Sequence, residues 1–230
     1  MALATWWKND PLPLLRPLSN FTTGLATNHL LMARLNRLPI DEVRQRLQAG
    51  HRPYIGYWEG QPVAYGWVAT ESASIGEVNL KFTLPRGNRY LWDFATLPEF
   101  QGRGIYPHLL QGILHIESRE AERFWILYAP ENLPSGAGMT KAGLLPVGQL
   151  SFQADGRVGL TIFNDSHRAA EGAKVFGVPL VQTMLAPCWH CGGMMEQTLT
   201  DEQQLCWPPA SIRATNTTHC TCAIEIRPSS

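Results

Sequence analysis

The first 187 residues of this 230-residue sequence contain no cysteine, and all five cysteines follow them. The N-terminus lacks a basic segment followed by an apolar core, so it does not resemble a signal peptide. In a protein without an export signal, clustered cysteines indicate a metal site rather than disulfide bonds. We therefore expect a cytoplasmic protein whose C-terminal segment binds a metal.

Long apolar runs and net charge are also missing. No stretch approaches the roughly 18–20 apolar residues that a membrane helix needs, so we expect no membrane partner. Nineteen basic residues balance nineteen acidic residues, which argues against a protein built to bind nucleic-acid phosphates. Hydrophobic residues make up 44% and charged residues 17%, the balance of a folded chain with one full domain and a small appendage.

The order of the predicted elements favours an α/β (α+β) fold, with a mixed, mostly antiparallel sheet flanked by helices. Aromatic-rich runs on both sides of Glu59-Gly60-Gln61 predict a hairpin, and Asp155-Gly156 predicts a second one. A continuous apolar run at 123–129 indicates a buried central strand. The remaining elements are an edge strand at 12–18, helices at 28–37, 41–48 and 132–143, and a strand–turn–helix unit at 89–121.

The turn of that unit, PEFQGRGIY at residues 98–106, holds two glycines between a strand-like run and a helix-like run. Glycines let the backbone approach a ligand closely, and the N-terminus of the following helix favours an anion such as phosphate. No Gly-Lys-Ser/Thr follows, so the turn is not a nucleotide P-loop, and it lacks the third glycine of a dinucleotide fingerprint. Taken alone, Gly102-x-Gly104 fits a structural helix cap equally well.

Its wider context resembles the acetyl-CoA loop of the GCN5-related N-acetyltransferase (GNAT) superfamily. The family pattern is Gln/Arg-x-x-Gly-x-Gly/Ala; Gln101 and Gly104 match it, and Tyr106 replaces the final small residue. A second family pattern, Asn-x-x-Ala-x-x-x-Tyr-x-x-x-Gly, is similar to the residues that begin at Asn132, with Met139 at the tyrosine position. The element order over residues 10–163 resembles that fold as well.

The resemblance implies acetyl-CoA, or another acyl-CoA, as co-substrate. The amides of residues 102–106 would hold its pyrophosphate, with Arg103 in support, and the backbone of residues 94–97 would pair with its pantetheine arm. The second motif would line the other side. The residues assigned to the cofactor are Phe94, Ala95, Thr96, Leu97, Gln101, Gly102, Arg103, Gly104, Ile105, Tyr106, Asn132 and Ser135.

The activity implied by the resemblance is N-acyl transfer, most simply of acetyl to a primary amine that attacks the thioester directly. Asp93, on the strand before the loop, is the candidate base, with Glu131 as a rival; Asp93 equally fits a carboxylate that binds a turn or solvent. Met139 cannot donate a proton, so Tyr90, or Ser135 acting through water, is the candidate acid. Tyr106 lies near the expected pyrophosphate, far from the sulfur, and is expected to pack rather than to act as the acid. Solvent alone is the remaining possibility. The acceptor, a small molecule or a protein amine, stays open.

The cysteine segment carries its own motif. Cys188 and Cys191 form a C-x-x-C-G turn, and Cys220 and Cys222 form a second pair. Four thiolates suit a tetrahedral structural Zn²⁺, as in the zinc ribbon that this segment resembles. Either Cys206 or His219 is an alternative fourth ligand.

Residues 181–230 hold two basic and four acidic residues, whereas ribbons that bind nucleic acid are usually basic. We therefore expect a structural or protein-contact role, such as formation of a homodimer or a cover over the acceptor site.

The predicted organisation is an acyl-CoA-binding domain at 1–165, a helix and linker at 166–186, and a zinc-ribbon-like module at 187–230. Two other hypotheses remain beside the enzyme. The first is a non-catalytic module that uses the same fold to bind CoA or a protein. The second is a nucleic-acid-associated enzyme docked by its ribbon, which the charge balance disfavours.

Overall fold

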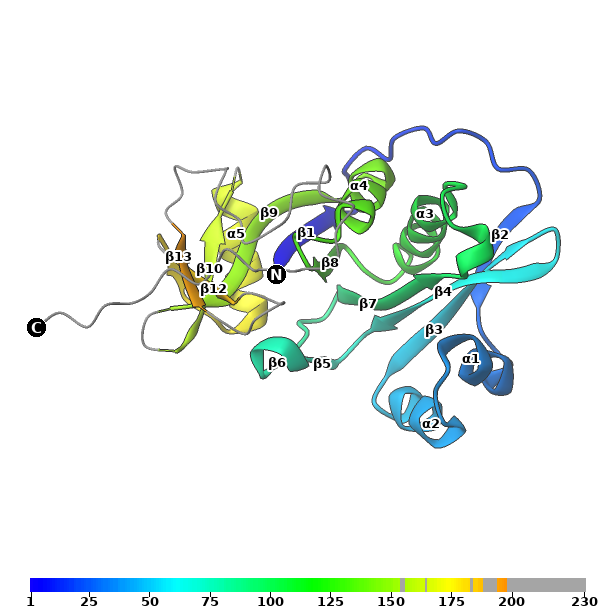
Figure 1. The fold of residues 1–230 in the computed structure, drawn as a ribbon, viewed down its shortest axis with the longest axis horizontal. Helices are drawn as coiled ribbons and strands as arrows, with labels where there is room; N and C mark the ends of the chain where they lie inside the picture. The colour runs from blue at the N-terminus through cyan, green and yellow to red at the C-terminus, as the bar shows by residue number, and fades with distance from the viewer. Residues whose placement is uncertain (154–155, 164, 183, 188–193, 198–230) are drawn as a thin grey trace, which may run out of the picture.

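The computed structural model describes residues 1–153, 156–163, 165–182, 184–187 and 194–197, drawn as a ribbon in Figure 1. The elements, in chain order, are β1 (Ala2–Trp7), β2 (Phe21–Leu25), α1 (His29–Asn36), α2 (Ile40–Gln48), β3 (His51–Trp58), β4 (Gln61–Ala69), β5 (Ser72–Ile75), η1 (Gly76–Val78), β6 (Leu80–Thr83), β7 (Asn88–Thr96), η2 (Pro98–Phe100), α3 (Ile105–Glu117), β8 (Arg123–Tyr128), α4 (Leu133–Ala142), β9 (Leu145–Phe152), β10 (Val158–Ile162), α5 (Ser166–Phe176), β11 (Leu180–Val181), β12 (Met184–Pro187) and β13 (Met194–Gln197).

One large sheet organises the molecule, with the strand order β11-β10-β9-β1-β8-β7-β4-β3-β2. Its neighbours are antiparallel except for β7 with β8 and β10 with β11. The expectation of a mixed, mostly antiparallel sheet is thus confirmed. Within the described residues, no helix is long and apolar enough to cross a membrane.

The predicted edge strand at 12–18 is wrong. Residues 12–18 have no regular structure, because Pro13 and Pro17 supply no backbone N–H for a strand ladder. The first strand is instead β1, which lies inside the sheet between β8 and β9. Its side chains are almost all buried, so the alternation that marks a half-exposed strand is absent from its sequence.

Helices cover both faces of the sheet. On one face, α3 packs its apolar stripe, including Leu109 and Ile113, against β4 and β7. On the other face, α1 and α2 enclose Met32 and Val43 with Trp67 of β4. Figure 1 shows α3 on one side of β3 and β4, and α1 with α2 on the other. The helix expected at the start of 166–186 is α5, and its Phe176 packs in the core beside Trp125.

The strands β7 and β8 separate part-way along their length. Their parallel pairing runs from Asn88 to Leu91 on β7 and then stops. The pairing of β7 with β4 continues to Thr96, but with one extra residue on β7. Asp93, in this irregular stretch, has a left-handed backbone with φ of +50°. The extra residue is a β-bulge, which bends a strand and re-aims its side chains.

The end of α3 distant from the glycine turn is fixed by a buried carboxylate. Glu117 is 1% exposed and accepts hydrogen bonds from Arg89 Nε at 2.7 Å and from the Tyr54 hydroxyl at 2.6 Å. Arg52 adds a third contact at 3.2 Å. A carboxylate at a helix C-terminus opposes the helix dipole, so these donors from β3 and β7 compensate it and hold the helix on the sheet.

We expect Glu117→Gln to lower the free energy of unfolding by about 3 kcal/mol, because it leaves the buried Arg89 guanidinium with only the exposed Glu120 as a partner charge. Urea denaturation followed by circular dichroism measures this change. Glu120→Gln is the matched control, since Glu120 binds the same two arginines from the exposed surface of the same helix end. Equal effects of the two substitutions would contradict the anchoring role of Glu117.

Candidate active site

The N-terminus of α3 has unused backbone donors. Gly104 is its cap residue, with φ of +78°, and provides no side-chain hydrogen bond. Gly102 has φ of +76°, and the space above both glycines is open to at least 4 Å. Among the five α-helices of the described residues, α3 alone has neither a side-chain cap nor an acidic residue in its first turn. The exposed N–H groups and the helix dipole therefore favour an anion here.

Two side chains of the glycine turn, Gln101 and Arg103, already contact neighbouring residues. Gln101 Nε2 donates to the Thr96 carbonyl at 3.1 Å, which ties the turn to the end of β7. The Arg103 guanidinium lies over the Trp58 ring, 5.3 Å from its centroid, and over Phe100 at 5.7 Å. Stacking of this kind orients the cation beside the turn without using its hydrogen-bond donors.

A cleft of about 340 Å³ opens where β7 and β8 separate; we call it the strand cleft. Residues from β7, β8, α3, α4 and the loops beside them line it: Met1, Glu77, Trp92, Asp93, Phe94, Tyr106, Ile126, Leu127, Tyr128, Ala129, Glu131, Asn132 and Ser135. Six of the residues predicted from the sequence are therefore gathered in one place: Asp93, Phe94, Tyr106, Glu131, Asn132 and Ser135.

The edge of β7 along the strand cleft has lost its partner strand. Beyond Leu91, β7 remains paired only with β4 among the described strands. Leu97 N–H also turns toward β4 and donates to the Val63 carbonyl at 2.9 Å. The opposite edge of residues 92–96 is thus available to an extended ligand, in the manner of an added strand.

Asp93 faces the strand cleft with one side of its carboxylate already bound. Its Oδ2 accepts from Arg46 Nη1 at 2.5 Å and from Asn36 Nδ2 at 3.2 Å. Arg46 also binds Glu42 at 2.7 Å and lies over the Trp92 ring at 4.5 Å. Among the described residues, nothing donates to Asp93 Oδ1. The group Glu42–Arg46–Asp93 therefore has one net negative charge and one free carboxylate oxygen at the cleft.

The candidate acids differ in position. Tyr90 does not line the strand cleft; it is buried against Phe82 and Phe176, and burial raises the pKa of its hydroxyl. Ser135 does line the cleft, in the first turn of α4, where its backbone N–H donates to Asn132 Oδ1 at 3.1 Å. Met139 is 1% exposed and packs in the core under α4.

Two titratable side chains that the sequence analysis did not select also line the cleft. Glu77 comes from η1 in the β5–β6 hairpin, and Tyr128 ends β8. Residues 72–87 showed no clear pattern in the sequence, so no signal pointed to Glu77. Tyr128 lies in the predicted buried strand at 123–129. Its place at the cleft depends on the separation of β7 from β8, which the sequence does not show.

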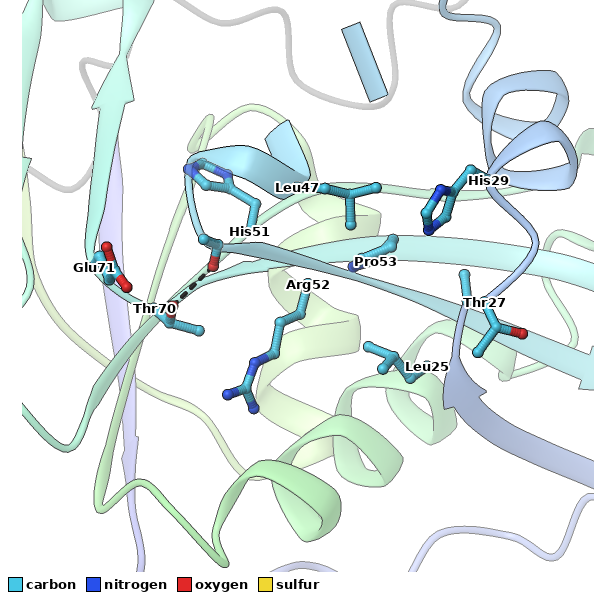
Figure 2. Close-up of a pocket in the computed structure, with 11 residues that line it drawn as sticks. Leu25, Thr27, His29, Leu47, His51, Arg52, Pro53, Thr70 and Glu71 are labelled. Atoms are coloured by element: carbon cyan, nitrogen blue, oxygen red, sulfur yellow. Dashed lines mark hydrogen bonds between the residues drawn. The ribbon is translucent and has the colours of Figure 1, made fainter. Parts of the chain in front are cut away.

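A second hollow, of about 500 Å³, lies beside the starts of β3 and α1 (Figure 2). Some of its polar groups already have partners: Thr70 donates to the Gly50 carbonyl at 2.8 Å, and Arg52 reaches Glu117 and Glu120. His51 Nε2 lies 3.1 Å from the Ser72 carbonyl. These contacts support the chain.

The predicted zinc ligands Cys188, Cys191, Cys220 and Cys222 lie outside the described residues, as do Cys206 and His219. The described residues contain no group of three or more histidine, cysteine or acidic residues able to hold a metal. The zinc site stays a prediction from the sequence.

Several solved structures are similar to this chain. A protein described as a GNAT-family acetyltransferase from Novosphingobium aromaticivorans is 13% identical, with 63% of this chain and 59% of that chain covered and a TM-score of 0.44. A GCN5-related N-acetyltransferase from Kribbella flavida is 15% identical, with 63% and 53% covered and a TM-score of 0.41. The chain thus spans less than two thirds of either protein.

An aminoglycoside N-acetyltransferase solved with CoA is 16% identical to the chain, with 58% and 96% covered and a TM-score of 0.44. A search of curated proteins found no matching relative.

The model of the acetyltransferase (GNAT) family matches residues 25–143. That range contains the glycine turn, both strands of the strand cleft, and α4. It covers more than half of the sequence, and the chain therefore belongs to the acetyltransferase (GNAT) family.

Proposed function

We propose that this protein transfers the acetyl group of acetyl-CoA to a primary amine. The observation that carries the proposal is the position of the strand cleft, which opens beside the uncapped N-terminus of α3. An anion site and an unpaired strand edge follow each other along one path. Phosphate and amide-rich pantetheine are the two chemical parts of CoA that such a path suits.

The cofactor residues take distinct roles in this proposal. The backbone N–H groups of residues 102–106 bind the pyrophosphate, and Arg103 contributes charge from its position over Trp58. Pantetheine pairs with the free edge of residues 94–96. Leu97 can offer its carbonyl only, because its N–H donates to Val63. Asn132 and Ser135 border the opposite side of the strand cleft.

The reaction needs a neutral amine and a donor for the oxyanion that forms on the thioester carbonyl. The donor in this proposal is a backbone N–H of the β7 bulge, where the ladder with β8 has ended. Asp93 receives the amine through Oδ1 and accepts its proton, directly or through water. Arg46 and Asn36 hold Oδ2 and so keep the carboxylate pointing at the cleft.

The alternative is a protein that binds CoA without turnover, which the burial of Met139 keeps open because α4 offers no tyrosine at that position. Incubation of the full chain with acetyl-CoA and an amine panel separates the two functions. The panel contains polyamines, aminoglycosides, amino acids and lysine peptides. Amine-dependent release of thiol supports the enzyme; CoA binding without release with any amine supports the alternative.

We expect Gly104→Glu to weaken CoA binding by at least about tenfold, or ~1.4 kcal/mol, because a carboxylate would occupy the anion site at the α3 N-terminus. Isothermal titration calorimetry with CoA measures the affinity. Gly87→Glu is the matched control, since Gly87 has φ of +79°, equally open surroundings and a position in the turn before β7. Equal weakening by both substitutions would show backbone strain rather than loss of the anion site.

We expect Asp93→Asn to lower kcat/KM for the amine by roughly 100-fold or more, the usual range for loss of a general base. The KM for acetyl-CoA should stay unchanged. Glu42→Gln removes the other carboxylate that binds Arg46 and leaves the cleft intact, so it controls for disruption of the network. A loss with Glu42→Gln as large as that with Asp93→Asn would contradict the role of Asp93 as the base.

The sequence also leads us to propose one structural Zn²⁺ held by Cys188, Cys191, Cys220 and Cys222. Purified full chain should contain one zinc per chain by mass spectrometry of the metal, and Cys188→Ser with Cys191→Ser should remove it. CoA binding should survive the double substitution, because the strand cleft is built from residues 1–135. Absence of zinc from the wild type would contradict this site.

A further inference from the structure

Acyl transfer from CoA produces a thiolate that must receive a proton, and the strand cleft offers few groups to supply one. Its carboxylates accept hydrogen bonds when ionised and do not donate them. Among the residues that line the cleft, hydroxyl groups belong to Tyr106, Tyr128 and Ser135. A phenol is a far stronger acid than an aliphatic alcohol, so among these hydroxyls the choice lies between the two tyrosines. The Met1 ammonium, which also lines the cleft, already donates to the Leu150 carbonyl at 2.7 Å.

The Tyr106 ring is fixed in the space between α3 and α4. A Cβ atom added to Gly138 would lie 2.5 Å from Tyr106 Cδ1, so α4 admits the ring only because that position is glycine. On its other side, the ring is 5.8 Å from the Phe94 ring, centroid to centroid, in an edge-on contact. Phe94 follows directly after Asp93 in the β7 bulge. Tyr106 is thus positioned where β7 and β8 separate.

The Tyr106 hydroxyl also has a partner on the cleft wall. Burial raises the pKa of Tyr106 to about 12, and a hydrogen bond with the Ser135 side chain acts in the opposite direction. The hydroxyl therefore keeps its proton at neutral pH, and Ser135 stabilises the tyrosinate once the proton has left. For Tyr128, burial raises the pKa in the same way, but no described residue makes a hydrogen bond with its hydroxyl.

We propose that the Tyr106 hydroxyl donates the proton that the CoA thiolate takes up, with Ser135 as the positioning residue. The amine nitrogen forms a bond to the thioester carbon, the carbon–sulfur bond breaks, and sulfur takes the Tyr106 proton. The amine proton leaves through Asp93 to solvent, and the tyrosinate regains a proton from water. This inference rests on the proposed acetyl transfer and assigns a step that Met139, buried in the core, cannot perform.

The first test compares the binding of CoA with that of desulfo-CoA, which lacks the sulfur, by calorimetry. The wild type should prefer CoA by at least about threefold, and Tyr106→Phe should abolish that preference. Tyr57→Phe, on the face of β3 covered by α1 and α2, should keep it. If Tyr106→Phe weakens both ligands equally and keeps the preference, the ring has a packing role and the inference is overturned.

The second test is steady-state turnover with acetyl-CoA and an amine found in the panel. We expect Tyr106→Phe to lower kcat by at least about tenfold with an unchanged KM for acetyl-CoA, and Ser135→Ala to lower kcat by less. A wild-type kcat in Tyr106→Phe, or a larger loss in Tyr128→Phe, overturns the assignment of Tyr106 and leaves the acetyltransferase proposal standing. Failure of the wild type to bind CoA at all overturns both.

Discussion

The bulge in β7 at Asp93 is the feature on which the rest of the site depends. A residue other than glycine at φ of +50° is unfavourable, and here Arg46 and Asn36 bind the carboxylate that extends from it. The extra residue places Trp92 and Asp93 toward α1 and α2, and Phe94 toward α3. The same irregularity coincides with the end of pairing to β8. The strained residue therefore lies where the cleft opens and the strand edge is free, and its carboxylate lines the cleft.

The helices on the two faces of the sheet hold different parts of the site around β7. On one face, Glu117 fixes the C-terminus of α3 to β3 and β7, and so determines where its N-terminal amides point. On the other face, Asn36 of α1 and Arg46 of α2 hold Asp93. The anion site and the carboxylate thus depend on separate sets of contacts. Substitution in one set should leave the other intact, as is required for binding and chemistry to be examined separately.

Much of the fold and part of the site could be predicted from the sequence. The glycine turn, the strand at 123–129 and the helix after Asn132 have local signals, and each is present. The strand β1 was missed because a strand buried on both faces shows no alternation. The bulge could not be predicted, because the residues around Asp93 form an ordinary strand pattern and give no signal for a left-handed residue within it. The position of Tyr106 depends on contact with Gly138, thirty-two residues away in the chain, and a local pattern does not encode such contacts.

The central claim is that CoA lies along the free edge of β7 and over the N-terminus of α3. Hydrogen–deuterium exchange of the full chain, with and without CoA, tests it most directly. The account predicts slower exchange at residues 94–96 and 102–106 when CoA is bound, and no change around the second hollow at Gly50 and Thr70. Unchanged exchange at the glycine turn, or protection centred on the second hollow, would contradict the account.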